Sequence, residues 1–156
     1  MFEYDIIIPM IYFATDHRGF ILKEKLKEFV GELGYEIKDF GAFKEDSEDD
    51  YPNFIRRAAE AVSKNPLKDK AIILGGSGQG EAVTANRFPG VRAAVFYGGP
   101  MDIIKLSREH NDANILSLGA SFIDEATAQE AVRLWLETPF SGEERHMRRI
   151  HEIDGI

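Results

Sequence analysis

A glycine-rich loop is the segment of this chain best suited to chemistry. It reads Gly-Gly-Ser-Gly-Gln-Gly-Glu over residues 75–81 and directly follows an apolar, β-prone run at 71–74. Glycines let a backbone approach a ligand closely, and N–H groups that converge where a helix begins bind anions. The same sequence could form a plain tight turn between a strand and a helix. Four glycines in six positions favour the ligand-binding interpretation.

The common nucleotide-binding and hydrolase motifs do not describe this loop. It lacks the Gly-Lys-Ser/Thr ending of a nucleoside-triphosphate loop. Its glycine spacing differs from G-x-G-x-x-G, and the next strand ends in Phe-Tyr-Gly at 96–98 without an acidic residue, which argues against a dinucleotide. The residues around Ser77 do not complete the G-x-S-x-G elbow of hydrolases.

Glu81 stands directly behind the glycines. A carboxylate beside anion-binding N–H groups is poorly placed to hold a stable dianion. It is well placed to remove a proton next to a carbonyl, because the N–H groups would then stabilise the developing enediolate. The loop therefore predicts proton abstraction with Glu81 as the base.

Three other positions carry polar groups of interest. Asp16 and His17 follow the first expected strand, at the edge where open α/β sheets bind ligands. Asp16 could instead cap a helix. His110 ends an expected helix, where it could interact with the helix dipole or shuttle a proton near neutral pH.

The last expected helix is basic. Arg145 and Arg149 are four residues apart, so they share a helix face and could clamp a phosphate. A solvated basic face is the alternative. The chain as a whole is acidic, with 27 Asp and Glu against 19 Lys and Arg, so cations gathered on one helix favour the clamp.

These residues would be positioned by β-prone runs that alternate with amphipathic stretches, a pattern typical of an α/β protein with a parallel sheet covered by helices. Strands are expected at residues 6–14, 35–40, 71–74, 91–96 and 114–118. Helices are expected at residues 19–33, 52–63, 100–109, 124–137 and 143–152, with one more opening at the glycine loop. No repeat or long linker interrupts this pattern, which predicts a single domain over residues 1–156.

Composition argues against several classes of protein. The chain has 156 residues, 44% of them apolar, with no apolar run near the roughly 20 residues of a membrane span. A net charge of −8 argues against a nucleic-acid partner. There is no cysteine, which fits a cytoplasmic protein. The four histidines lack metal-binding spacing, so we expect no metal and no cofactor.

Together these features resemble the ribose-5-phosphate isomerase B family, which includes galactose-6-phosphate and allose-6-phosphate isomerases. The resemblance runs from about residue 11 to 150 and rests on six segments in a fixed order: 15–20, 50–52, 76–81, 85–93, 106–114 and 145–149. It implies a Rossmann-like α/β/α sandwich with a five-stranded parallel sheet. It also implies a homodimer or homotetramer with sites at the subunit interface.

The activity implied is aldose–ketose isomerisation of a sugar phosphate, with ribose 5-phosphate and ribulose 5-phosphate the first pair. A hexose 6-phosphate isomerase is one alternative, and a phosphosugar-binding protein without catalysis is another. One branch of the family uses a cysteine where this chain has Gly75, and the other uses a glutamate at the position of Glu81. This chain is similar to the second branch.

The resemblance also implies roles for individual residues. His110 would open the sugar ring and Ser77 would assist nearby. Substrate contacts would come from Asp16, His17, Gly76, Gly78, Gln79, Gly80, Asn111, Arg145 and Arg149.

Two departures bear on which sugar phosphate is preferred. Many family members have an arginine where this chain has Ser121. The segment Tyr-Gly-Gly-Pro-Met at 97–101 is also unusual for the family.

Overall fold

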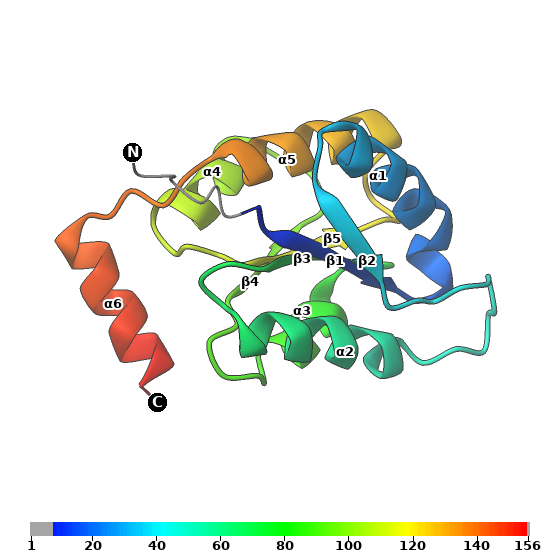
Figure 1. The fold of residues 1–156 in the computed structure, drawn as a ribbon. Coiled ribbons are helices and arrows are strands. Elements are labelled where there is room, and N and C mark those ends of the chain that lie inside the picture. Colours follow the sequence, from blue (N-terminus) through cyan, green and yellow to red (C-terminus); the bar gives the residue numbers. More distant parts are fainter. Residues whose placement is uncertain (1–7, 156) are drawn as a thin grey trace, which may run out of the picture.

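The computed structural model describes residues 8–155 and contains a five-stranded sheet in the order β2-β1-β3-β5-β4 (Figure 1). Every pairing in it is parallel, so the expected architecture is confirmed. The strands are β1 (Met10–Thr15), β2 (Glu36–Asp39), β3 (Lys70–Gly75), β4 (Ala93–Phe96) and β5 (Ile115–Gly119).

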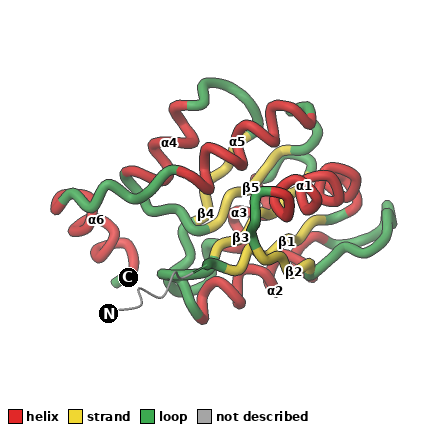
Figure 2. Tube along the Cα trace, turned by 45° about the horizontal axis from the view of Figure 1, so that its top comes forward, coloured by secondary structure: helices red, strands yellow, loops and turns green. Residues whose placement is uncertain are grey.

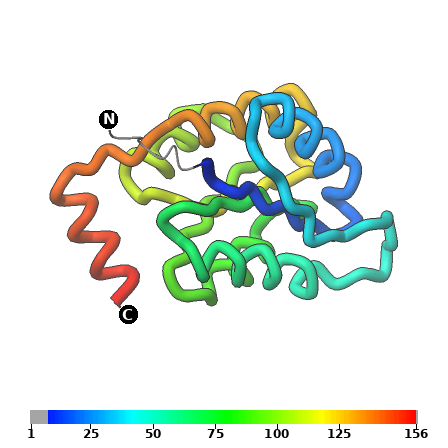
Figure 3. Tube along the Cα trace, viewed as in Figure 1, coloured from blue at the N-terminus to red at the C-terminus, as the bar shows by residue number. Residues whose placement is uncertain are grey.

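Helices cover both faces of the sheet (Figure 2). In Figure 1, α1 (Phe20–Glu32), α4 (Asp102–Glu109) and α5 (Glu125–Glu137) lie above it, and α2 (Tyr51–Lys64) and α3 (Gln79–Ala85) lie below. A short 3-10 turn, η1 (His17–Gly19), links β1 to α1. The last helix, α6 (Glu144–Asp154), lies to one side of these layers, at the end of an extended connection (Figure 3).

Alternating strand residues build one core on each face, as the pleat of a β-strand requires. Ile72 and Leu74 of β3 belong to the core under α1, α4 and α5. Ala71 and Ile73 point the other way, into the core with α2 and α3. All four side chains are fully buried, so β3 is the central strand on which the neighbouring loops are built.

The element boundaries differ slightly from the sequence expectation. The first strand was expected from Ile6, which lies outside the described residues, and β1 begins at Met10. The helix expected from Pro100 begins at Asp102, because Gly98 and Gly99 adopt positive φ angles of 118° and 101° and form a turn first. Asp124 caps the start of α5, since its side chain accepts a 2.8 Å hydrogen bond from the backbone N–H of Thr127.

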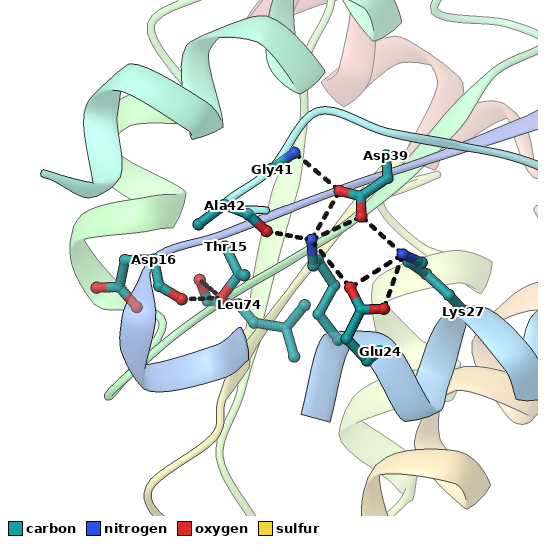
Figure 4. A network of polar contacts seen from close by, with 9 residues as sticks. Thr15, Asp16, Glu24, Lys27, Asp39, Gly41, Ala42 and Leu74 are labelled. Atoms are coloured by element: carbon teal, nitrogen blue, oxygen red, sulfur yellow. Dashed lines mark hydrogen bonds and ion pairs between the residues drawn. The ribbon is translucent and has the colours of Figure 1, made fainter. Parts of the chain in front are cut away.

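A buried lysine fixes the loop that follows β2 (Figure 4). The Lys23 side chain is fully buried, and its Nζ donates to both carboxylate oxygens of Asp39 at 2.7 and 2.8 Å and to the carbonyl of Ala42 at 2.6 Å. Burial raises the pKa of the Asp39 carboxyl. The hydrogen bonds from Lys23, Lys27 and the Gly41 backbone outweigh that effect and hold this pKa below its usual value.

We expect Asp39→Asn to lower the free energy of unfolding by about 3–5 kcal/mol, as is typical when one partner of a buried ion pair is removed. The Lys23 charge would stay buried without its carboxylate. Urea denaturation measures the loss. The control is Lys25→Gln, which breaks an exposed pair with Glu125 and should cost about 1 kcal/mol or less. Equal effects in the two variants would contradict a structural role for the buried pair.

Within residues 8–155, no helix has both the length and the apolar character needed to cross a membrane.

Candidate active site

The chain reverses its direction across the sheet between two neighbouring strands. From β1 it crosses to β2 on one side, and from β3 it crosses past β5 to β4 on the other. In open parallel sheets, ligands bind at the carboxyl ends of the strands at such a switch point. Asp16 follows β1 and the glycine loop follows β3, so both expected groups meet at this point.

A cavity of about 370 Å³ opens there. Five of the predicted site residues line it: Asp16, Gly76, Ser77, Gly80 and Glu81. The remaining lining residues are Arg18, Tyr51, Ser121 and Phe122. His17, Gly78 and Gln79 adjoin the lining residues in sequence without lining the cavity themselves. The structure therefore brings together the carboxyl-edge half of the predicted site.

The loop is held against the end of β5. Gly78 has a φ of 79°, a conformation that favours glycine, and its carbonyl accepts a 2.7 Å hydrogen bond from the buried Ser117 hydroxyl. The backbone N–H groups of Ala120 and Ser121 donate to the carbonyls of Gly75 and Gly76 at 2.8 and 3.0 Å. Since the carbonyls are tied back in this way, the loop presents its N–H groups instead.

These N–H groups are available to a ligand. Those of Gly76, Ser77, Gly78 and Gly80 donate to no other residue within the described chain 8–155. The first N–H groups of α3 also lack intrahelical partners, because no helical turn precedes them to provide carbonyl acceptors. The loop thus offers converging donors at a helix N-terminus, which suits a developing oxyanion.

Glu81 lies in the first turn of α3, and only 4% of it is exposed. Burial raises the pKa of its carboxyl, and the charge of Asp16 raises it further, although its own backbone N–H works in the opposite direction. A raised pKa makes the carboxylate a stronger base at a given pH.

Gly75 makes room for this carboxylate. A Cβ atom placed on Gly75 would collide with the carboxylate group of Glu81. A side chain at position 75 and the observed conformation of Glu81 are therefore mutually exclusive. This fits the glutamate branch that the sequence resembles.

His17 is paired with a carboxylate that the sequence did not single out. Its Nδ1 lies 2.6 Å from Oδ1 of Asp49, and the same oxygen accepts from the His17 backbone N–H at 3.2 Å. The hydrogen bond that the His17 ring donates to Asp49 is the main cause that raises the pKa of His17 above its usual value of 6.5, although partial burial opposes it. Most of the charged segment 44–50 is exposed, but Asp49 is half-buried in this contact.

One cluster in the described residues has the makings of a metal site. Ligand atoms of Asp16, His17 and Asp49 lie within 4.8 Å of one another. Asp16 Oδ1 already accepts a 2.9 Å hydrogen bond from the Arg18 backbone, and His17 Nδ1 is bound to Asp49. These hydrogen bonds occupy one ligand atom of each residue, whereas the buried Oδ2 of Asp49 has no hydrogen-bond partner among residues 8–155.

We expect Asp49→Asn to lower the pKa of His17 toward 6.5, because a neutral amide stabilises imidazolium less than a carboxylate does. In the native protein this pair contributes stability below the unfolded pKa, and the contribution is lost as the pH rises through the folded pKa. A histidine NMR titration measures the shift. The control, Glu48→Gln, removes the same charge from an exposed neighbour. An unchanged His17 titration in Asp49→Asn would contradict the assignment.

The other predicted residues lie at the opposite, amino edge of the sheet. Asn111 follows the end of α4, and its carbonyl accepts a 2.9 Å hydrogen bond from Arg92, just before β4 begins. Arg92 also binds Asp154 at the end of α6 at 2.9 Å. The Ser141 backbone donates to Glu109 at 3.2 Å. Both ends of the α6 segment are thus tied to the amino edge.

His110, which caps α4, stacks on His146 of α6, with ring centroids 4.2 Å apart and planes at 17°. Burial lowers the pKa of His146, and His110 and Arg145 lower it further. The exposed side chains of Arg145 and Arg149 are on the same helix. We call His110, Asn111 and the two arginines the second half of the predicted site, or second half-site, and the residues at the carboxyl edge the first.

The two half-sites do not meet within one chain. The five residues of β5 separate the two edges of the sheet, which at about 3.3 Å per residue amounts to roughly 15 Å or more. This is too far for Glu81 and His110 to act on the same sugar.

Comparison with known proteins identifies the family. The ribose/galactose isomerase family matches residues 11–153. The chain belongs to this family. It is 38% identical over 140 residues to ribose-5-phosphate isomerase B of Mycobacterium tuberculosis (strain ATCC 25618 / H37Rv), covering 90% of this chain and 85% of the relative. It is 36% identical over 146 residues to the Escherichia coli (strain K12) protein of that name, covering 94% and 95%.

Solved structures of the family have the same fold. Ribose-5-phosphate isomerase B from Mycoplasma genitalium, with bound ribulose-5-phosphate, gives a TM-score of 0.90 at 34% identity, covering 94% of each chain. The Clostridium thermocellum enzyme gives 0.86 at 40% identity, covering 94% of this chain and 95% of the other.

Sequence reasoning missed three residues that line the cavity: Arg18, Tyr51 and Phe122. The first two lie inside segments that carried the family resemblance, at 15–20 and 50–52, so proximity to known motifs was the available signal. For Phe122, the only signal in the sequence was its position directly after Ser121, in the loop that follows β5. Arg18 lies next to Ser121 across Gly76, where the family resemblance led us to expect an arginine.

Proposed function

We propose that this chain interconverts ribose 5-phosphate and ribulose 5-phosphate, and that residues 1–156 form one cytoplasmic isomerase domain. The observation that carries the proposal is the buried carboxylate of Glu81 beside unpartnered backbone N–H groups in one cavity. This pair of features suits enolisation of a carbonyl compound. Family relatives are named for this reaction.

The chemistry follows from those positions. In open-chain ribose 5-phosphate, Glu81 removes the proton on C2, next to the aldehyde carbon. Negative charge develops on O1 and is stabilised by the N–H groups of the glycine loop. The proton on O2 moves to O1, an exchange that we assign to Ser77, and Glu81 returns its proton to C1. The product is ribulose 5-phosphate.

The complete site needs two chains. His110 is assigned to ring opening, and it lies at the edge of the sheet opposite to Glu81. A homodimer in which the amino edge of one protomer meets the carboxyl edge of its partner would unite them. Two-fold symmetry would form the site twice, and a homotetramer could be built from two such dimers.

The partner's amino edge would also bring Arg145 and Arg149 to the substrate. Two guanidinium groups on one helix face match the oxygens of a phosphate. The glycine loop then contacts the reacting end of the sugar, and Asp16, His17 and Asn111 contact its hydroxyl groups. No cofactor takes part in this scheme.

Turnover on a panel of sugar phosphates tests the function. We expect ribose 5-phosphate to have the highest kcat/KM, ahead of allose 6-phosphate and galactose 6-phosphate, and activity to persist after prolonged chelation. A preference for a hexose phosphate would reassign the substrate. A loss on chelation that one divalent ion restores would overturn the metal-free scheme. Binding without turnover on any sugar phosphate would indicate a phosphosugar-binding protein.

A further inference from the structure

We infer that Arg18 binds the phosphate group of the substrate, in the same cavity and from the same chain as Glu81. The inference rests on the proposed function, because it takes the ligand to be a sugar phosphate. Neither the sequence motifs nor the roles implied by the family resemblance assigned a function to Arg18.

Arg18 lies at the carboxyl edge of the sheet, in η1 directly after β1. Its backbone N–H donates to the buried carboxylate of Asp16 at 2.9 Å, which fixes where its side chain starts. The side chain then runs along the glycine loop. A Cβ placed on Gly76 would lie 2.9 Å from Arg18 Cδ, 3.7 Å from Arg18 Nε and 3.6 Å from Ser121 Oγ. The absence of a side chain on Gly76 leaves this strip of the cavity wall open to Arg18.

Among the residues that line the cavity, Arg18 is the only one with a positive charge, against the carboxylates of Asp16 and Glu81. Its guanidinium has no hydrogen bond or ion pair to any residue between 8 and 155. Arg92 and Arg108, in contrast, are held by carboxylates and carbonyls. The charge and donors of Arg18 are therefore free for a ligand, in a protein whose net charge of −8 would otherwise repel an anion.

The phosphate is the part of a sugar phosphate that needs a permanent cation. In the proposed mechanism, the N–H groups of the loop bind the reacting oxygens, which leaves the phosphate to other groups. Arg18 belongs to η1 and Glu81 to the first turn of α3, so the two side chains line the cavity from different elements. The planar fork of donors on the Arg18 guanidinium matches phosphate oxygens.

Arg18→Met tests the inference, because it keeps an apolar stem and removes the charge. Binding of ribose 5-phosphate and of inorganic phosphate is measured by calorimetry, and KM and kcat are measured with ribose 5-phosphate. We expect both dissociation constants and KM to rise about 10-fold or more, as for loss of a hydrogen bond to a charged group, with a much smaller change in kcat. Arg18→Lys should restore part of the affinity.

The matched control is Arg57→Met, an exposed arginine on α2 that does not line this cavity. It should leave the three constants within about twofold of wild type, since exposed arginines far from a ligand contribute little. If Arg18→Met behaves like Arg57→Met, or weakens unphosphorylated ribose as much as ribose 5-phosphate, the inference is wrong. Wild-type turnover with an unaffected Arg18→Met would leave the proposed function standing. Binding that depends on Arg18 without turnover would refute the proposed function alone.

Discussion

Glu81→Gln should lower kcat for ribose 5-phosphate by roughly 10²–10⁴-fold, the range expected for loss of a general base. Glutamine keeps the size of the side chain and one hydrogen-bond acceptor, but it cannot take up the proton from C2. Substrate affinity should change little, because the loop N–H groups and the phosphate contacts remain. Steady-state kinetics and calorimetry together separate these two effects.

The pH dependence provides a second measure of the same assignment. Burial and Asp16 raise the pKa of Glu81, and the base is active only when deprotonated. The activity of wild type should therefore rise as the pH increases through this pKa, and the residual activity of Glu81→Gln should lack that limb. The control is Glu130→Gln, at an exposed position on α5. It should keep both the wild-type kcat and the rise of activity with pH. Near-normal kcat in Glu81→Gln would remove this residue from the mechanism.

The helices could be predicted from the spacing of their apolar residues, and the strands from short β-prone runs such as Ala-Ile-Ile-Leu at 71–74. Because successive side chains of β3 point to opposite faces of the sheet, this one run contributes to both cores. The order of the strands could not be predicted in the same way. Nothing in the local sequence says that β5 inserts between β3 and β4. That order is set by which apolar faces pack together across the whole chain.

The candidate site could be predicted only in part, because only some of its residues are neighbours in sequence. Residues adjacent in sequence, such as those of the glycine loop, stay adjacent in the fold. The contact between His17 and Asp49 joins residues 32 positions apart, and a run of acidic residues normally indicates a solvated loop. The family resemblance led us to expect sites at the subunit interface, and the fold adds a physical reason, since Glu81 and His110 lie at opposite edges of the sheet.

That separation leads to the prediction with the clearest outcome. A homodimer of Glu81→Gln should be inactive because both sites lack the base, and a homodimer of His110→Asn because both lack the ring-opening group. When the two variants are unfolded and refolded together, about half of the dimers are mixed. Each mixed dimer holds one site with both defects and one with neither, so about a quarter of all sites should regain activity.

The position of each residue in the sheet provides a matched control. Asp16 and Glu81 lie at the same edge, so refolding Glu81→Gln with an inactive Asp16→Asn variant leaves one defect in every site. That mixture should regain nothing. Glu81→Gln refolded with Arg145→Ala should behave like the His110→Asn mixture, because Arg145 belongs to the opposite edge. Recovery in the Asp16 mixture, or none in the His110 mixture, would mean that the two half-sites do not combine across a dimer interface. Because roughly 15 Å separates the two edges within one chain, we expect activity to be recovered through the partner chain.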